Sequence, residues 1–175
     1  KGRSWGAETS LTWSDEKTSV EAYYTLSWSK RLFPDFNPEW YMDRNDNRHK
    51  LTLMAKHKFG KRLEVYGAWN WHSGNRLTMA SHYTEGRYGN SVYAHPNNVK
   101  LPDYHRLDVG LNFVKTTKRG NTSILNLSIY NAYCRTNPIS AFEDMTVRDN
   151  KVLAYYGLAV GIIPIVPTFS YTLKF

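Results

Sequence analysis

The sequence ends in Thr168-Phe169-Ser170-Tyr171-Thr172-Leu173-Lys174-Phe175, where apolar and polar residues alternate strictly. In a β-strand, successive side chains point to opposite faces, so the aromatic and leucine residues share one face and the polar residues share the other. Such a strand needs an apolar medium on one side and water on the other. Outer-membrane barrels provide this arrangement, with apolar side chains toward lipid and polar ones toward the lumen. The ending therefore predicts a transmembrane β-strand.

The composition of the 175-residue chain is compatible with this prediction. Only 41% of the residues are hydrophobic, but 15% are aromatic, including 13 Tyr and 6 Trp. No stretch approaches the roughly 18 consecutive apolar residues of a transmembrane helix. A barrel strand commits only alternate residues to lipid, so modest hydrophobicity does not exclude it. The net charge of +8 is spread over the whole chain without a basic run, and no nucleic-acid-binding motif is present, so we expect no nucleic-acid partner.

Period-2 alternation predicts seven antiparallel strands and an all-β fold. We expect these strands at residues 3–13, 18–30, 48–59, 62–76, 104–115, 122–135 and 162–175, with residues 151–161 extending the last one outward. The turn Gly60-Lys61-Arg62 predicts a hairpin in which Lys58 lies opposite Glu64 and Lys56 opposite Tyr66. The same alternation predicts that Leu53, Trp69, Leu111 and Leu127 lie on the outer wall of the barrel and face lipid.

The connections between these segments alternate in length. Residues 14–17, 60–62 and 116–121 are short turns, whereas 31–47, 77–103 and 136–150 are long loops, with 77–103 expected to be the largest. Bacterial barrels have short periplasmic turns and long extracellular loops. This pattern predicts that the seventh strand ends at the periplasmic rim.

The odd strand number predicts that the barrel is incomplete in this sequence. Single-chain bacterial barrels have even strand counts, and unpaired strand edges in lipid cost several kcal/mol for each lost hydrogen bond. The sequence begins at Lys1 already inside a strand pattern. We therefore expect residues 1–175 to be the C-terminal portion of a barrel domain.

Three stretches carry a resemblance to a known family. They are Leu101-Pro102-Asp103-Tyr104-His105-Arg106-Leu107-Asp108, Ile129-Tyr130-Asn131-Ala132-Tyr133-Cys134-Arg135-Thr136-Asn137-Pro138 and Ile163-Pro164-Ile165-Val166-Pro167. With the strand pattern, they resemble the C-terminal part of a TonB-dependent outer-membrane receptor or transporter of the Bacteroidetes type, over essentially the whole chain. Cys134 departs from this resemblance, because a polar residue such as Asn is expected there.

The resemblance implies a transmembrane antiparallel barrel of 22 strands, of which these are about the last seven, with a plug and earlier strands absent from this sequence. It implies a Gram-negative outer-membrane protein that imports a siderophore–iron complex, cobalamin, an oligosaccharide or a peptide into the periplasm. Its implied partners are outer-membrane lipid, TonB through the missing N-terminal part, the barrel-assembly machinery and a surface lipoprotein.

Aromatic residues cluster at both ends of the expected strands. Trp5, Trp28, Trp69, Trp71 and Tyr133 map to the outer ends, and Trp13, Phe59, Phe113 and Phe175 map to the periplasmic ends. Amphipathic rings prefer the headgroup level of a membrane, so these sets are typical of two interfacial girdles. The alternative is the core of an ordinary β-sandwich.

The long loops supply candidate ligand contacts. Aromatic side chains stack on rings and arginine pairs with anions, which favours substrate binding by Trp40, Tyr41, Arg76, His82, Tyr83, Arg87, Tyr88 and Tyr93. The alternative is that these residues pack loop against loop or on a partner lipoprotein. The terminal series Phe169, Tyr171, Leu173 and Phe175 is a candidate assembly signal, because the resemblance implies that the assembly machinery reads such a strand.

No catalytic pattern is legible. The six histidines lack metal-site spacing, and Cys134 and the serines have no visible activating base. We therefore expect no enzyme activity, no cofactor and no metal. Two alternatives remain open: a small stand-alone structural or adhesive barrel, with an eighth strand in residues 136–161, and a barrel enzyme such as a lipase or protease.

Overall fold

The computed structural model describes residues 1–84, 90–118, 120–148, 151–161 and 163–175. Every regular element in these ranges is a β-strand, which confirms the all-β prediction. None of the described residues form a helix long and apolar enough to cross a membrane.

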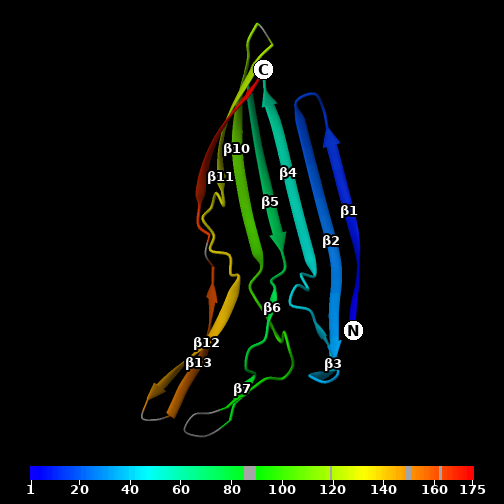
Figure 1. Cartoon of the computed structure of the whole chain (residues 1–175), viewed down its shortest axis with the longest axis vertical. Coiled ribbons are helices and arrows are strands. Elements are labelled where there is room, and N and C mark those ends of the chain that lie inside the picture. Colours follow the sequence, from blue (N-terminus) through cyan, green and yellow to red (C-terminus); the bar gives the residue numbers. More distant parts are fainter. Residues whose placement is uncertain (85–89, 119, 149–150, 162) are drawn as a thin grey trace.

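Seven strands form one antiparallel sheet (Figure 1). In spatial order they are β1 (Gly2–Ser14), β2 (Thr18–Phe33), β4 (His49–Phe59), β5 (Leu63–His72), β10 (Tyr104–Thr116), β11 (Thr122–Tyr130) and β14 (Val166–Lys174). A shorter strand, β3 (Asn37–Met42), pairs with the end of β2. All seven long strands lie where the sequence alternation predicts them.

The two ends of the sheet differ, as the loop lengths predict. Short turns and the C-terminus gather at one end, which we call the turn end, and long connections gather at the other, the loop end (Figure 1). Three small hairpins lie within the long connections: β6 (Arg76–Leu77) with β9 (Val99–Lys100), β7 (His82–Tyr83) with β8 (Ser91–Val92), and β12 (Ser140–Arg148) with β13 (Lys151–Val160).

Several sequence predictions about the loop end are wrong. Residues 136–150 are not a plain loop, because β12 occupies most of them, and 151–161 do not extend the last strand, because β13 pairs with β12 instead. The connection between β11 and β14 is also longer than the one containing 77–103. Alternation reveals a strand but not its partner, and this is why the β12–β13 hairpin was missed.

Three strand ends also differ from prediction by four residues or more. The seventh expected strand begins at Val166 instead of residue 162. The fourth expected strand stops at His72 instead of residue 76, and the sixth stops at Tyr130 instead of residue 135. After Tyr130 the chain turns sharply, because Asn131 adopts a left-handed conformation with φ of 55°. Asn tolerates this conformation better than most residues, but an extended strand does not accommodate it.

The register of the sheet keeps most of its apolar residues on one face, with exceptions such as Met54 and the Val114–Ile124 pair. Lys58 lies opposite Glu64 and Lys56 opposite Tyr66, which confirms the predicted hairpin. On the face opposite these lysines, the pairing produces rows such as Ala22–Leu53–Trp69–Leu107 and Val65–Leu111–Leu127–Phe169. We call the face that carries these rows the apolar face.

The apolar face is not covered by protein. Leu53 and Leu127 are 40% and 41% exposed and Phe169 is 67% exposed, whereas Trp69 and Leu111 are half-buried between neighbouring side chains. Among the residues whose side chains are described, Leu101 is the only buried hydrophobic residue. The described part of the sheet therefore has no hydrophobic core of its own, and its apolar face is left exposed.

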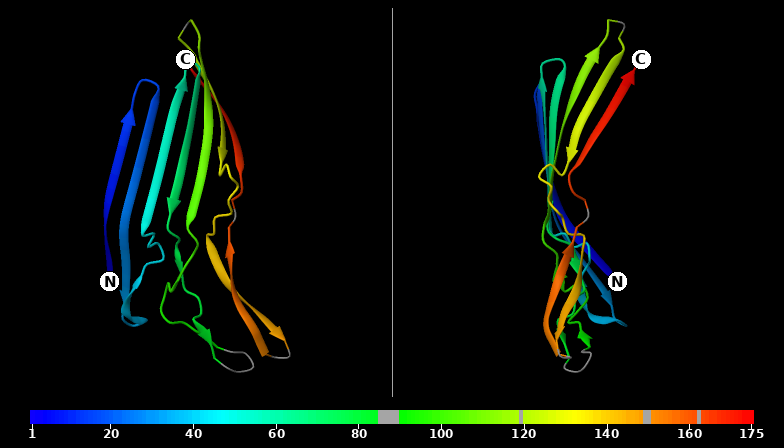
Figure 2. Two further views of the ribbon diagram at one scale, coloured as in Figure 1. Left: turned by 180° about the vertical axis from the view of Figure 1, so that it is seen from behind. Right: turned by 90° about the vertical axis from the view of Figure 1, so that its left-hand side faces the viewer.

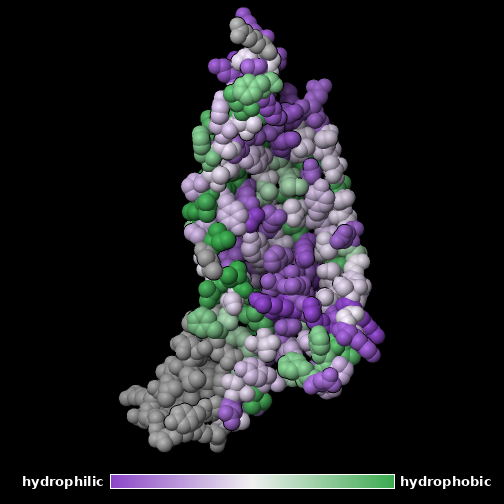
Figure 3. Space-filling view, in the orientation of Figure 1, coloured by the Kyte–Doolittle hydropathy of each residue, from purple (hydrophilic) through white to green (hydrophobic). Residues whose placement is uncertain are grey.

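The opposite face, the polar face, carries hydroxyl, amide and charged side chains. Figure 3 shows hydrophilic residues gathered over the middle of this part of the molecule. A chain of hydrogen bonds crosses three strands here. Asn126 donates to the Tyr66 hydroxyl (2.7 Å) and to the Asn112 side chain (2.7 Å), and Asn112 donates to the Glu64 carboxylate (3.0 Å). Tyr66 reaches across β10 because Gly110 lies beneath its ring.

The sheet is open at both edges. Each edge strand, β1 and β14, pairs on one side only in the described part of the chain. Since neighbouring strands alternate in direction, the first and seventh strands run the same way. Figure 2 shows the sheet twisting from one edge to the other without the edges meeting. The β12–β13 hairpin, which covers the expected eighth strand in 136–161, forms a separate sheet.

A methyl group at Gly110 should disturb the polar face. Its Cβ would lie 2.4 Å from the Tyr66 ring, so the Gly110→Ala variant should displace the phenol from Asn126 and lower the free energy of unfolding by about 1 kcal/mol. The matched control is Gly67→Ala, whose Cβ meets its nearest atom at 3.5 Å. Denaturant unfolding measures both. Equal stability of the two variants would contradict the role assigned to Gly110.

Candidate functional site

The buried polar residues of the chain gather where the strands pass into the long connections. Of the described residues, the buried polar ones are Asp43, Asp46, Asn47, Ser73, Asn131 and Asn137. Buried polar groups are costly unless they are hydrogen-bonded. Five of these side chains bond to groups of another connection or strand, and the side chain of Asn131 joins the two ends of its own connection. Together they fix the loop end of the sheet.

Asp46 anchors the connection between β3 and β4. Its Oδ1 accepts a hydrogen bond from the Ser29 amide at 2.8 Å, and its Oδ2 lies 3.1 Å from the Arg48 guanidinium and 3.9 Å from that of Arg76. Its side chain is only 1% exposed. Next to it, Asn47 donates to the Ser73 carbonyl at 3.0 Å and to the Asn75 side chain. Two long connections are thereby joined.

Asn131 plays the same part after β11. Its side-chain amide donates to the carbonyls of Arg135 (2.8 Å) and Ile163 (3.2 Å), and its Oδ1 accepts from the Arg135 amide (3.1 Å). Its backbone amide donates to Asp108 at 2.9 Å. Asn137 then bonds both backbone groups of His105. These bonds hold the segment that leaves β11 against β10 and against the entry to β14.

Two loop carboxylates are shifted toward the charged form. Burial opposes the charge of Asp43, but hydrogen bonds from Arg31 and from the Asn45 amide outweigh it, so the pKa of Asp43 lies below its ordinary value of 3.8. Burial likewise opposes the charge of Asp103, but Lys100 at 2.8 Å and the Gly74 amide at 3.1 Å lower the pKa of this carboxyl. The Arg31–Asp43 pair ties the connection between β3 and β4 to β2, whereas the Lys100–Asp103 pair and the Gly74 amide hold together the connection between β5 and β10.

A second polar cluster lies on the polar face near the loop end. The guanidinium of Arg106 pairs with Asp108 at 2.8 Å, donates to the hydroxyls of Tyr104 (2.9 Å) and Tyr130 (2.6 Å) and lies 4.0 Å from the ring centre of Tyr130. Beside it is a pocket of about 160 Å³, closed on one side by Ile139 and Ile163. We call Tyr104, Arg106, Asp108 and Tyr130 the Arg106 cluster. It presents two aromatic rings and a guanidinium whose charge is paired with Asp108 to any molecule bound on this face.

Aromatic and cationic side chains form a belt on the apolar face at the loop end. Trp5 stacks on Trp28 with ring centres 6.0 Å apart, and Arg48 lies 5.0 Å from the Trp28 ring centre. Further along, His49 bonds the Tyr24 hydroxyl at 2.8 Å and stacks on Trp71. The belt ends at His105, whose ring is tilted against that of Trp69 with ring centres 6.4 Å apart and which bonds the Tyr133 hydroxyl at 2.7 Å. The sequence predicted these Trp residues and Tyr133 at this end, but missed the two histidines between them.

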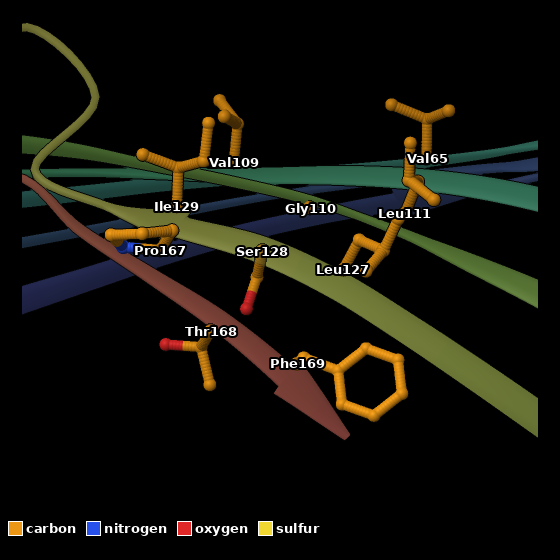
Figure 4. Close-up of a pocket in the computed structure, with 10 residues that line it drawn as sticks. All are labelled: Val65, Val109, Gly110, Leu111, Leu127, Ser128, Ile129, Pro167, Thr168 and Phe169. Atoms are coloured by element: carbon orange, nitrogen blue, oxygen red, sulfur yellow. The ribbon is translucent and has the colours of Figure 1, made fainter. Parts of the chain in front are cut away.

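Below this belt, the apolar face has a depression of about 450 Å³ formed by β5, β10, β11 and β14 (Figure 4). It is lined by the apolar side chains of Val65, Val109, Leu111, Leu127, Ile129, Pro167 and Phe169, together with Gly110, Ser128 and Thr168. The remaining members of the expected assembly signal continue the same face toward the turn end, with Tyr171, Leu173 and Phe175 exposed. Apart from Ser128, Thr168 and the hydroxyl of Tyr171, this part of the surface offers apolar contacts.

The predicted ligand residues do not form a single cluster among those the structure describes. Trp40 and Tyr41 lie in β3, with the Trp40 ring beneath Arg3, and Arg76 lies beside Asp46 as part of a loop anchor. His82 and Tyr83 form β7, some distance from β3 (Figure 1), and Tyr93 follows β8 and is exposed. Arg87 and Tyr88 lie outside the described residues. The structure therefore does not test substrate contact by this set.

No group of three or more His, Cys, Asp or Glu side chains in the described ranges has a geometry that could hold a metal ion. Cys134 is exposed and adopts a φ of 54°.

A methyl group at Gly74 should loosen the loop end. Its Cβ would lie 1.8 Å from the Leu101 carbonyl oxygen, which is backbone and cannot move aside alone. In Gly74→Ala we expect amide exchange of residues 73–75 and 101–103 to be at least about tenfold faster, equivalent to about 1.4 kcal/mol of local opening free energy. Gly2→Ala is the control, because its Cβ meets no atom within 4 Å. Unchanged exchange in Gly74→Ala would contradict the anchoring role.

The Asp43 ion pair should make the β2–β4 connection sensitive to acid. Because the folded pKa is depressed, the pair stabilises this connection fully above the ordinary value of 3.8 and loses that effect as pH falls through the lower folded pKa. Pepsin should therefore cleave near residues 43–48 faster at about pH 3 than at about pH 5. The ratio of the two rates should exceed the ratio that pepsin shows on an unstructured peptide. Asp43→Asn should remove this excess; an identical excess in the variant would assign it to other groups.

Comparisons with family models, curated proteins and solved structures gave no match for this chain. Its function therefore has to be inferred from the two faces of the sheet and the connections at its loop end.

Proposed function

We propose that this sheet is part of the wall of a Gram-negative outer-membrane β-barrel transporter of the TonB-dependent class. The transporter binds a scarce nutrient outside the cell and releases it into the periplasm. One observation carries the proposal: a continuous, uncovered apolar face spans seven antiparallel strands whose other face is mainly polar, with a few apolar residues such as Met54, Val114 and Ile124. Soluble monomers rarely expose apolar patches larger than a few hundred Å², so such a face needs lipid or another protein layer.

Strand length and end chemistry favour lipid over a second protein sheet. A strand needs about 9–11 tilted residues to cross a bilayer, and the seven strands have 9 to 16 residues. The stacked Trp5 and Trp28 lie at the loop end of this face, and exposed Trp13, Phe59, Phe113 and Phe175 lie toward the turn end. Two aromatic levels separated by aliphatic side chains are typical of a membrane-spanning wall, whereas a sandwich core would not need them.

The open edges favour a larger barrel over a small one. Since β1 and β14 run the same way, they cannot pair with each other in an antiparallel barrel. An odd number of further strands is required between them, and in lipid their unpaired backbone groups would cost several kcal/mol each. The β12–β13 hairpin cannot supply the missing strand from its place outside the sheet. This arrangement disfavours a stand-alone structural or adhesive barrel made of these residues.

In this proposal the polar face lines the lumen and the loop end faces outward. The Arg106 cluster and the chain from Glu64 to Tyr66 would face a plug or the transport path, while the anchored connections would present ligand-binding loops. Loops held on a rigid scaffold are where binding residues concentrate. The substrate classes remain a siderophore–iron complex, cobalamin, an oligosaccharide or a peptide. The proposed partners are TonB, the assembly machinery and a surface lipoprotein.

The direct test of this function is nutrient uptake by cells that express the complete polypeptide. Growth on each of the four nutrient classes as the limiting source should identify one that requires the protein. Deleting TonB should abolish that uptake to the same extent as deleting the protein. Uptake that persists without TonB would contradict the proposed class of transporter.

An arginine on the apolar face should be costly at mid-strand. Leu111 lies in the middle of β10, so Leu111→Arg should destabilise the folded protein in lipid by about 2–4 kcal/mol. The control is Ser170→Arg, because Ser170 is exposed on the polar face at nearly the same level of the sheet. Urea unfolding in lipid vesicles measures both variants. Equal costs for the two arginines would mean that the apolar face does not meet lipid.

Deletion of Phe175 should impair assembly more than transport. This residue is 95% exposed at the end of the apolar series on β14, whose outer edge is unpaired. We expect several-fold less folded protein in the outer membrane but normal uptake per folded molecule, since no loop-end contact is altered. Surface labelling and uptake should be quantified together. Normal assembly with impaired uptake would assign Phe175 to transport.

A further inference from the structure

Two cations lie side by side on the apolar face, at the loop end of β1 and β2. Arg3 pairs in register with Lys30, two residues beyond the pair formed by Trp5 and Trp28. Strands rise about 3.3 Å per residue, so the cations lie roughly 6–7 Å further toward the loop end than the stacked rings. Because the register fixes their face, both side chains belong to the surface that carries the aromatic belt.

The Arg3 guanidinium is held in place by a ring of β3, the strand on the other side of β2. It lies over the Trp40 ring, 4.6 Å from the ring centre, and Trp40 belongs to β3, which is held against β2 by the Lys30–Met42 pairing. Cation–π contact of this kind orients a guanidinium without consuming its hydrogen-bond donors. Lys30 is half-buried between β1 and β3, whereas Arg3 is exposed. The donors of Arg3 therefore remain available on the surface.

Neither cation is neutralised by a described carboxylate. Residues 1–42 are all described, and the register places the acidic residues of β1, β2 and β3, which are Glu8, Glu21 and Glu39, on the polar face. The adjacent Arg31 provides the contrast, because it points to the polar face and pairs with Asp43. On the apolar face, two positive charges therefore stand together beside three tryptophan rings.

We propose that this corner, defined by Arg3, Lys30 and Trp5, Trp28 and Trp40, binds the phosphate group of a glycolipid headgroup in the outer leaflet. The proposal rests on the proposed function, which places the apolar face in a membrane. Tryptophan rings prefer the headgroup level, so cations just beyond them meet lipid phosphates. Arginine can bind a phosphate with two parallel hydrogen bonds, and lysine adds a mobile point charge. The stacked rings then cover the upper part of the acyl chains.

The test is lipid retention by the complete polypeptide, purified in a nonionic detergent and measured by native mass spectrometry. The probes are diphosphorylated lipid A and the same lipid with its phosphates removed. We expect the native protein to retain the phosphorylated probe at least about tenfold better than the other. The double variant Arg3→Gln/Lys30→Gln should lose this preference, and Arg3→Lys/Lys30→Arg should keep most of it.

The control variant is Lys56→Gln/Lys58→Gln, which removes the same charge from exposed positions on the polar face and should retain the lipid normally. Equal retention of both probes, or unchanged retention after Arg3→Gln/Lys30→Gln, overturns the headgroup site and leaves the transporter proposal standing. A protein that stays dispersed without detergent and does not enter vesicles overturns the proposed function, and the headgroup site with it.

Discussion

The antiparallel hydrogen-bond ladder is the constraint on which the rest of the structure depends. Side chains alternate with a period of two, so a slip of one residue between neighbouring strands would move a whole apolar set to the other face. Across six consecutive strand pairs no such slip occurs, and rows such as Val65–Leu111–Leu127–Phe169 stay on one surface. The uncovered apolar face, the polar face and the belt at the loop end all follow from this register, which continues without a slip from strand to strand.

The same ladder explains why the long connections need buried polar anchors. The ladder stops at the loop end, and the backbone groups beyond it require other partners. Asp46 and Asn131 provide these partners by bonding to amides and carbonyls of neighbouring segments. Gly74 allows one such segment to pass directly over the Leu101 carbonyl. The connections are thereby held at fixed places on a rigid scaffold, as loops that bind ligands are.

Local alternation predicted the main sheet well and the loop end poorly. Each long strand, the alternating connection lengths and the Lys58–Glu64 pair could be read from spacing, because a period of two and short turns are local properties. The pairing of β12 with β13 and the end of β11 at Tyr130 depend on distant contacts and on the left-handed turn at Asn131. The Asp- and Asn-rich stretch 43–47 signalled turns, but nothing in its spacing identified Ser29, Ser73 or Arg76 as its partners. Candidate ligand residues chosen by type were consequently scattered, and Arg76 proved to be a structural anchor.

The central claim is that the odd-numbered residues of β10 face lipid and the even-numbered ones face water. It can be measured by placing a spin label at each residue from 107 to 113 in turn, leaving out Gly110, whose surface is covered by Tyr66. Cys134→Asn is a suitable background, because it removes the only cysteine and suits the positive φ at that position. In lipid vesicles, collision with molecular oxygen should be high at 107, 109, 111 and 113, and collision with a water-soluble nickel complex should be higher at 108 and 112. Low oxygen collision at the odd positions, or access of the nickel complex to them, would contradict a lipid-facing wall.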